Sequence, residues 1–168
     1  MPNRKQLFFL ILFFAVAGFF YSRPHNKAPL SDEEALQAVL LAVESRIAPD
    51  ALPLDQAIKQ VRGNGELVLV SFEDPNCPYC AELDQNISRI SNITHYTFLL
   101  PILSKDSTVK SKQIWCAPDP ASAWNNWMLN RTPPTGPGDC DTSALDRNLR
   151  LREKLGIRGV PYLLRVES

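Results

Sequence analysis

The feature that most constrains this chain is a pair of cysteines separated by two residues, Cys77-Pro78-Tyr79-Cys80. An apolar run of strand-forming residues, 67–72, precedes the pair, and a helical pattern begins at Pro78, a residue favoured in the first turn of a helix. Free N–H groups at a helix N-terminus stabilise a thiolate there, and the second cysteine lies one turn further in. The motif therefore predicts a reversible two-electron redox couple, with Cys77 as nucleophile and Cys80 as resolving thiol. Pro78 and Tyr79 would tune the couple.

A C-x-x-C pair can also be half of a zinc site, which needs a second close pair of ligands. The remaining cysteines, Cys116 and Cys140, stand far apart, and the only histidines are His25 and His95. The sequence therefore favours the redox interpretation and predicts neither a metal nor a cofactor. His95, which precedes a predicted strand, is expected at the surface or at a strand edge.

Cys116 and Cys140 most simply form a structural disulfide between a tryptophan-rich helix and a loop rich in proline and glycine, 131–141. Such a bridge would close a loop of about 25 residues and contribute roughly 3 kcal/mol to stability. A second redox relay is the alternative.

A second motif, Gly159-Val160-Pro161-Tyr162, stands at the start of a predicted strand. A proline in this position is commonly a turn residue, because cis X–Pro bonds are a small minority. If Pro161 were cis, the backbone of Val160 would lie beside Cys77, where it could pair with a substrate strand. Glu73 and Asp74 could modulate the reactivity of Cys77, but they are expected in an exposed loop, where carboxylates are usually solvated.

The N-terminus combines Arg4 and Lys5 with a continuous apolar run at residues 7–21 and small residues at Ala15 and Ala17. This pattern predicts a secretory signal, or an uncleaved anchor that tethers the protein to a membrane. Either one exports the rest of the chain, to a periplasm-like space. The 18 basic and 18 acidic residues cancel, so no net charge favours binding to nucleic acid.

Hydrophobic periodicity and breaker residues give the order of elements. A capping box of Ser31 and Glu34 opens a helix whose apolar positions continue to Ile47, and a second, short helix is predicted over 54–61. The later elements are a strand from Leu67, the helix from Pro78, a strand over 96–103, helical segments from Ser107 and from Ala121, a helix over 143–155 and a strand over 160–166. The order β-α-β-α-β predicts an α/β fold, with the cysteine pair where a strand ends and a helix begins.

Taken together, these motifs resemble the catalytic domain of the bacterial DsbC family of thiol:disulfide interchange proteins, within the thioredoxin-like superfamily. The matching residues are 54–59, 63–65, 72–80, 114–117, Cys140, 146–149 and 155–161. The resemblance implies a thioredoxin-like fold with a helical insertion between the second strand and the cis-proline strand. It implies disulfide reduction or isomerisation in periplasmic proteins, with Cys77 as nucleophile, Cys80 as resolving thiol, Pro161 as the cis-proline and Cys116–Cys140 as the structural bridge.

The chain departs from that family in two places. Family isomerases carry an N-terminal dimerisation domain, whereas residues 31–50 predict only a helix and a spacer, which favours a general reductase or oxidoreductase over an isomerase. The family fold also continues past the cis-proline strand with another strand and a helix, whereas this sequence stops at Ser168. An exposed strand edge and an uncovered sheet face are therefore expected.

The predicted organisation has three parts: a signal or anchor with a spacer at 1–28, an N-terminal helix and linker at 29–53, and a thioredoxin-like catalytic domain at 54–168. The expected partners are exported proteins that contain cysteines and a membrane thiol reductase that recycles the dithiol. A non-catalytic binding or assembly factor in the cell envelope is the alternative function.

Overall fold

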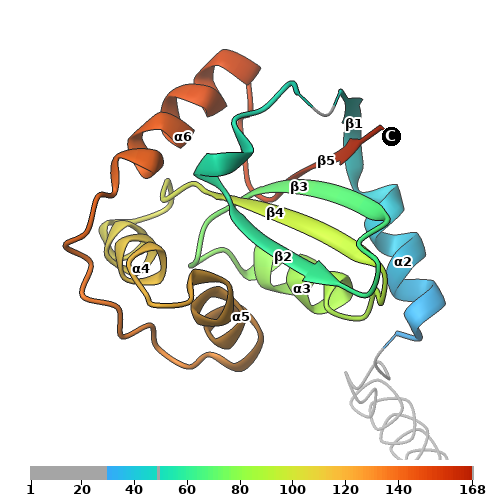
Figure 1. The fold of residues 1–168 in the computed structure, drawn as a ribbon, viewed down its shortest axis with the longest axis horizontal. Helices are drawn as coiled ribbons and strands as arrows, with labels where there is room; N and C mark the ends of the chain where they lie inside the picture. Colours follow the sequence, from blue (N-terminus) through green and yellow to red (C-terminus); the bar gives the residue numbers. More distant parts are fainter. Residues whose placement is uncertain (1–29, 49, 168) are drawn as a thin grey trace, which may run out of the picture.

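A five-stranded mixed sheet forms the centre of the computed structural model, which describes residues 30–48 and 50–167 (Figure 1). The strands are β1 (Val43–Ile47), β2 (Ile58–Arg62), β3 (Leu67–Glu73), β4 (Ile93–Leu99) and β5 (Tyr162–Val166). Their order across the sheet is β1-β5-β3-β4-β2. The β3–β4 and β1–β5 pairs are parallel, and the β2–β4 and β3–β5 pairs are antiparallel.

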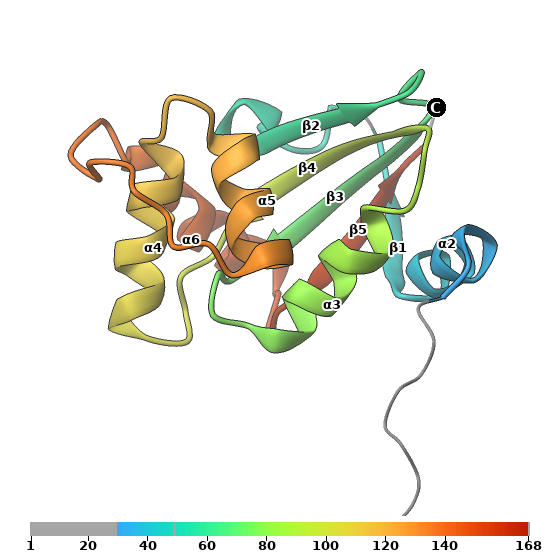
Figure 2. The same ribbon diagram turned by 90° about the horizontal axis from the view of Figure 1, so that it is seen from below.

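Helices cover both faces of this sheet. They are α2 (Asp32–Leu41), α3 (Pro78–Ile87), α4 (Lys105–Trp115), α5 (Pro120–Asn130) and α6 (Ser143–Leu155), with a short 3₁₀ turn at Leu54–Gln56. Figure 2 shows α3 against one face, with α2 and α5 on either side of it, while α6 lies on the opposite face. The sheet order and this layering match the predicted α/β fold with a helical insertion, which α4 and α5 form.

The central strand β3 carries the chain to the cysteine pair. Its last five residues, 69–73, are all buried, because helices cover both faces of the sheet at this end. A strand buried on both faces reads as a continuous apolar run, which is what the sequence shows up to Phe72. Phe72 stacks on Phe98 of β4 with ring centroids 4.8 Å apart on the α6 side.

Helix α3 begins where the sequence predicted. Cys77 is its N-cap and Pro78 occupies the first turn, where a missing N–H costs nothing. Its buried positions, Cys80, Ala81, Leu83, Asp84 and Ile87, repeat at helical spacing. At its other end, the Arg62 guanidinium donates to the carbonyl oxygens of Ile87 and Ile90, which stabilises the negative end of the helix dipole.

The predicted capping box is present: Ser31 and Glu34 exchange hydrogen bonds at the start of α2. The predicted extent of that helix is wrong, because α2 ends at Leu41 and residues 43–47 form β1. Val43 and Ile47 fit the helical spacing, but pairing with β5 satisfies their backbone groups in a sheet instead.

The short helix predicted over 54–61 is also wrong, because only one 3₁₀ turn forms there and Ile58–Arg62 becomes β2. The strand predicted over 96–103 is shifted: β4 begins at Ile93 and ends at Leu99. Pro101 cannot donate a ladder hydrogen bond, and the chain leaves the sheet before it.

The expected exposed edge beside the cis-proline strand is not found. Strand β1 pairs with β5 there, so β1 and β2 are the edge strands. Helix α2 also covers part of the sheet face, because Ala35 and Val39 are buried and Val39 packs with Leu83 and Leu163. Strand β1 and helix α2, which precede the rest of the domain in sequence, therefore cover the strand edge and the sheet face that were expected to be exposed.

No helix among residues 30–48 and 50–167 is long and apolar enough to cross a membrane. The apolar run at 7–21, predicted as a signal or an anchor, and His25 lie outside the described residues.

Candidate functional site

The Cys77 side chain lies at the N-terminus of α3 and faces the first turn of that helix. Its sulfur accepts a hydrogen bond from the backbone N–H of Cys80 at 3.3 Å, the geometry of an N-cap. Cys80 is fully buried inside the same turn, Cys77 is 3% exposed, and both cysteines are free thiols. The two sulfurs are therefore placed as an outer and an inner thiol of one couple.

The loop before β5 reaches the same place from the far end of the domain. The Val160–Pro161 peptide is cis, and Cys77 Sγ contacts the Val160 carbonyl oxygen at 3.6 Å. Tyr79 is 70% exposed on the outer side of the same turn. The structure thus gathers the residues that the sequence singled out for chemistry and for substrate contact: Cys77, Pro78, Tyr79, Cys80, Val160 and Pro161.

Asp74 holds the loop that leads into α3. One carboxylate oxygen accepts from the backbone N–H groups of Ile102 and Leu103, and the other accepts from that of Asn76. These bonds explain why Asp74 is fully buried, so the expectation that it is solvated in an exposed loop is wrong. Its carboxylate joins the loop to the segment that follows β4.

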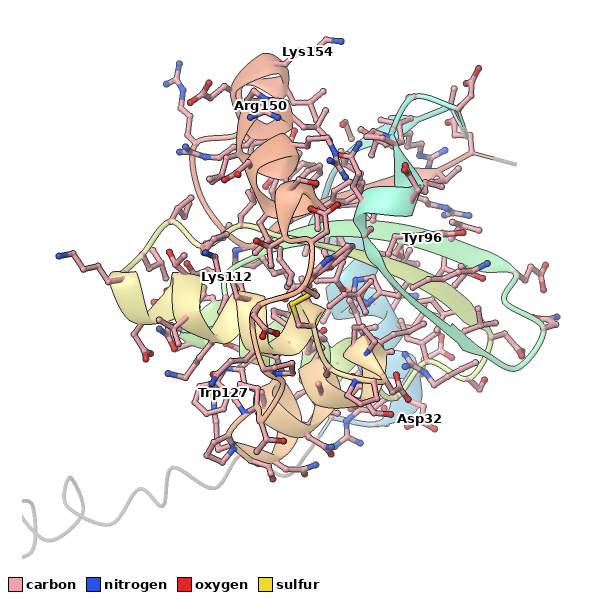
Figure 3. All side chains as sticks on the ribbon, turned by 60° about the vertical axis from the view of Figure 1, so that its left-hand side comes forward. Asp32, Tyr96, Lys112, Trp127, Arg150 and Lys154 are labelled. Carbon is pink, nitrogen blue, oxygen red and sulfur yellow. A yellow bond between two sulfur atoms is a disulfide. The ribbon has the colours of Figure 1, made fainter. Side chains whose placement is uncertain are left out.

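The helical insertion also braces this loop. The Trp127 indole N–H of α5 donates to the Pro75 carbonyl oxygen at 2.6 Å, and the Asn76 amide donates to the Asp106 carboxylate of α4 at 2.8 Å. Lys110 and Arg131 lie over the Trp127 ring, which Figure 3 labels.

A polar cluster lies under α3, between two hydrophobic clusters of the same face. The Ser71 hydroxyl donates to the Glu73 carboxylate at 2.5 Å and is 2.7 Å from His95 Nε2. All three residues are buried, so the predicted surface position of His95 and the predicted solvated position of Glu73 are wrong. Ser71 and Glu73 alternate with Val70 and Phe72 along β3, a period of two that could have revealed their shared face.

Burial governs the charge states of this cluster. It raises the pKa of Glu73 well above its usual value and that of Asp84 to about 7, and it lowers the pKa of His95 to about 3. It also raises the pKa of the Cys80 thiol, and the negative charge of Glu73 adds to that effect. The inner thiol is therefore held protonated in the reduced protein.

Cys116 and Cys140 are joined in a disulfide, with Cα atoms 5.6 Å apart. The bridge ties the C-cap of α4 to the loop that follows α5, and its yellow sulfur–sulfur bond is visible in Figure 3. Among the described residues, no group of three or more histidines, cysteines or acidic residues is arranged to hold a metal ion.

Comparison with known proteins places this arrangement in a class. The model of the thioredoxin-like domain family matches residues 54–168, so the chain belongs to that family. Over 120 residues it is 49% identical to a probable thiol:disulfide interchange protein DsbC of Bordetella pertussis, an alignment that covers 71% of this chain and 42% of that protein. A Bordetella avium protein of the same name is 43% identical over 140 residues, 82% of this chain and 50% of that protein.

A solved structure shows the same similarity. The crystal structure of a disulfide interchange protein from Neisseria gonorrhoeae superposes with a TM-score of 0.63 at 39% identity, covering 67% of this chain and 81% of that chain. The curated Bordetella relatives are longer, and the chain spans half of their length or less.

Proposed function

We propose that this chain is a thiol–disulfide oxidoreductase that reduces or isomerises disulfides in exported proteins. The observation that carries the proposal is the position of Cys77 Sγ, between the Cys80 N–H at 3.3 Å and the Val160 carbonyl at 3.6 Å. A sulfur at a helix N-terminus, beside a backbone segment that can pair with a polypeptide, is suited to attack a disulfide in that polypeptide. The relatives named thiol:disulfide interchange proteins support the same activity.

The reaction follows from the two thiols. The Cys77 thiolate attacks one sulfur of a substrate disulfide, so that a Cys77–substrate bond forms, the substrate S–S bond breaks and the released substrate thiolate takes a proton. Cys80 then loses its proton and attacks Cys77 Sγ, which releases the second substrate thiol and leaves a Cys77–Cys80 disulfide. Two electrons have passed to the substrate. In isomerisation, a substrate thiolate attacks the mixed disulfide instead, and Cys77 is released reduced.

Two features support this order of attack. Cys77 is the outer sulfur, whereas Cys80 is fully buried and its pKa is raised by burial. Pro78, Tyr79, Val160 and Pro161 would contact the substrate, because they surround the outer sulfur. The Cys116–Cys140 bridge would act structurally by fixing the insertion that braces the Cys77 loop.

The proposed location is the periplasm, with the protein either released by cleavage of the signal or held at the inner membrane through residues 7–21. The N-terminal pattern of the sequence supports export, and the Cys116–Cys140 disulfide suits an oxidising compartment. A reductase cycle also needs a dithiol donor, for which a membrane thiol reductase is the proposed partner.

Insulin reduction tests the activity. Wild-type protein with a dithiol reductant should accelerate reduction, Cys77→Ala should abolish the acceleration, and Cys80→Ala should accumulate a mixed disulfide with the substrate on Cys77. Equal turnover by wild type and Cys77→Ala would reject the enzyme and leave a non-catalytic binding factor. The redox potential of the Cys77–Cys80 pair would then give the direction of electron flow.

A further inference from the structure

Two hollows share Pro161 as a lining residue. The first, about 340 Å³, runs between α2 and α3 and reaches Tyr79 and Pro161 at the redox end. The second, about 360 Å³, follows the loop from Gly156 to Tyr162. A polypeptide held against the Val160 backbone would therefore extend into one or both of them.

Glu44 of β1 lines both hollows, and an irregularity in β1 accounts for its position. Val43 pairs with Leu163 and Ser45 pairs with the next residue, Leu164, so Glu44 has no partner in the ladder. This register shift acts as a β-bulge does, because it leaves one residue unpaired and redirects its side chain. Glu44 lies two residues after the C-cap of α2, Ala42, and lines both hollows beside Pro161.

The first hollow has an apolar floor and an acidic rim. Val39, Leu83 and Leu163, which are almost fully buried, form the floor. Two charged residues line it, Glu44 and Glu82, both exposed carboxylates without an ion-pair partner among the described residues. Arg158 lines the second hollow together with Glu44, so the charge of that hollow is mixed. The α2 side is therefore the side that favours a cation.

We infer that Glu44 determines substrate preference, by selecting polypeptide segments that carry a lysine or arginine within a few residues of the reacting cysteine. The apolar stem of such a side chain would lie over Val39 and Leu163, while its charged end reaches Glu44 and Glu82. This inference rests on the proposed function and names its substrate class. It also gives the α2–β1 segment a role in recognition in addition to its role in covering the sheet.

Paired peptides test the inference directly. Two disulfide-containing peptides, identical except for lysine or glutamate two residues from one cysteine, are reduced by wild type, Glu44→Gln, Glu44→Lys and Glu33→Gln. Glu33 is an exposed carboxylate of α2 that lines neither hollow, so its variant makes the same charge change outside the proposed contact.

Wild type should have a higher kcat/KM for the lysine peptide by roughly two- to five-fold, the range of one exposed ion pair, mostly through KM. The ratio of kcat/KM for the lysine peptide to kcat/KM for the glutamate peptide should move towards one in Glu44→Gln and fall below one in Glu44→Lys. In Glu33→Gln this ratio should equal that of wild type. The ratio should also shrink at high salt, because screening weakens exposed pairs. A ratio near one in wild type, or the same ratio in wild type and Glu44→Lys, would overturn the inference while the proposed activity stands.

A binding measurement separates the inference from the activity. In the double variant Cys77→Ala and Cys80→Ala, fluorescence anisotropy gives the Kd of each peptide in its reduced form. Tighter binding of the lysine peptide, lost in the further change Glu44→Lys, supports the inference even if no peptide is turned over. Equal Kd values for both peptides reject it, and absence of turnover by wild type rejects the proposed function.

Discussion

The Trp127 indole nitrogen lies 2.6 Å from the carbonyl oxygen of Pro75, two residues before Cys77. This bond connects the helical insertion to the loop that carries the outer sulfur. The insertion is therefore a brace for the redox site, since its removal would leave that loop held mainly by Asp74.

Replacing Trp127 by phenylalanine tests this brace. The variant should lose about 1 kcal/mol of unfolding free energy with the hydrogen bond, and its kcat/KM for disulfide reduction should drop several-fold because the Cys77 loop loosens. Urea unfolding and insulin reduction measure the two effects. Trp115→Phe is the matched control, since that indole donates to Asp141 in another loop. An equal loss of activity in both variants would refute the brace.

The buried cluster predicts a specific dependence of stability on pH. Between about pH 4.5 and 6.5, the folded protein holds a proton on Asp84 that the unfolded chain has released, because burial raises the pKa of Asp84 to about 7. The raised pKa of Glu73 changes stability with pH in the same direction. Over the same window the folded protein lacks a proton on His95 that the unfolded chain binds, because that pKa is lowered to about 3. Each bound proton changes the unfolding free energy by about 1.4 kcal/mol per pH unit. The raised pKa values of Asp84 and Glu73 therefore lower stability as pH rises, and the lowered pKa of His95 raises it.

Single variants should separate these contributions in urea unfolding at several pH values. Asp84→Asn removes one of the groups that lower stability as pH rises, so the unfolding free energy of this variant should depend less on pH than that of wild type. His95→Gln removes the group that raises stability as pH rises, so the unfolding free energy of this variant should fall more steeply with pH. Parallel curves for all three proteins would mean that these groups do not titrate as their burial predicts.

Removing the second cysteine pair should affect stability more than chemistry. The double change Cys116→Ala and Cys140→Ala should cost about 3 kcal/mol, the loop-closure contribution of a bridge that spans 24 positions. Unfolding without reductant measures the cost, and alkylation of Cys77 by iodoacetamide reports whether its loop remains intact. A variant that folds stably but no longer reduces insulin would instead indicate a redox relay.

Helix α2 should contribute to the stability of the whole domain. Val39 is 1% exposed and packs against α3 and β5, so Val39→Ala should lower the unfolding free energy by roughly 1–3 kcal/mol. Leu41, on the same helix, is 86% exposed, and Leu41→Ala should change it by less than about 0.5 kcal/mol. Equal, small effects would show that α2 is not docked in solution.

Local signals predicted the parts of this molecule that depend on neighbouring residues. The Cys77 N-cap, the buried run of β3 and the Gly156 stop of α6 each follow from a few adjacent positions. Strand β1 could not be predicted from adjacent positions, because Val43 and Ile47 suit a helix equally well. Only pairing with β5, more than 110 residues later, favours a strand there. The burial of His95 was missed for the same reason, since the parallel register of β3 and β4 brings it to Ser71.

The pairing of β1 with β5 also has a kinetic consequence. Residues 43–47 emerge early when the chain is synthesised, yet their partners at 163–166 emerge more than 110 residues later. Strand β1 must therefore stay unpaired until almost the whole domain has appeared, and contacts so distant in sequence form slowly. The position of Glu44 would be fixed only in this step. A partly synthesised chain would therefore carry both Cys77 and Cys80 before the proposed preference for a lysine or arginine near the reacting cysteine was in place.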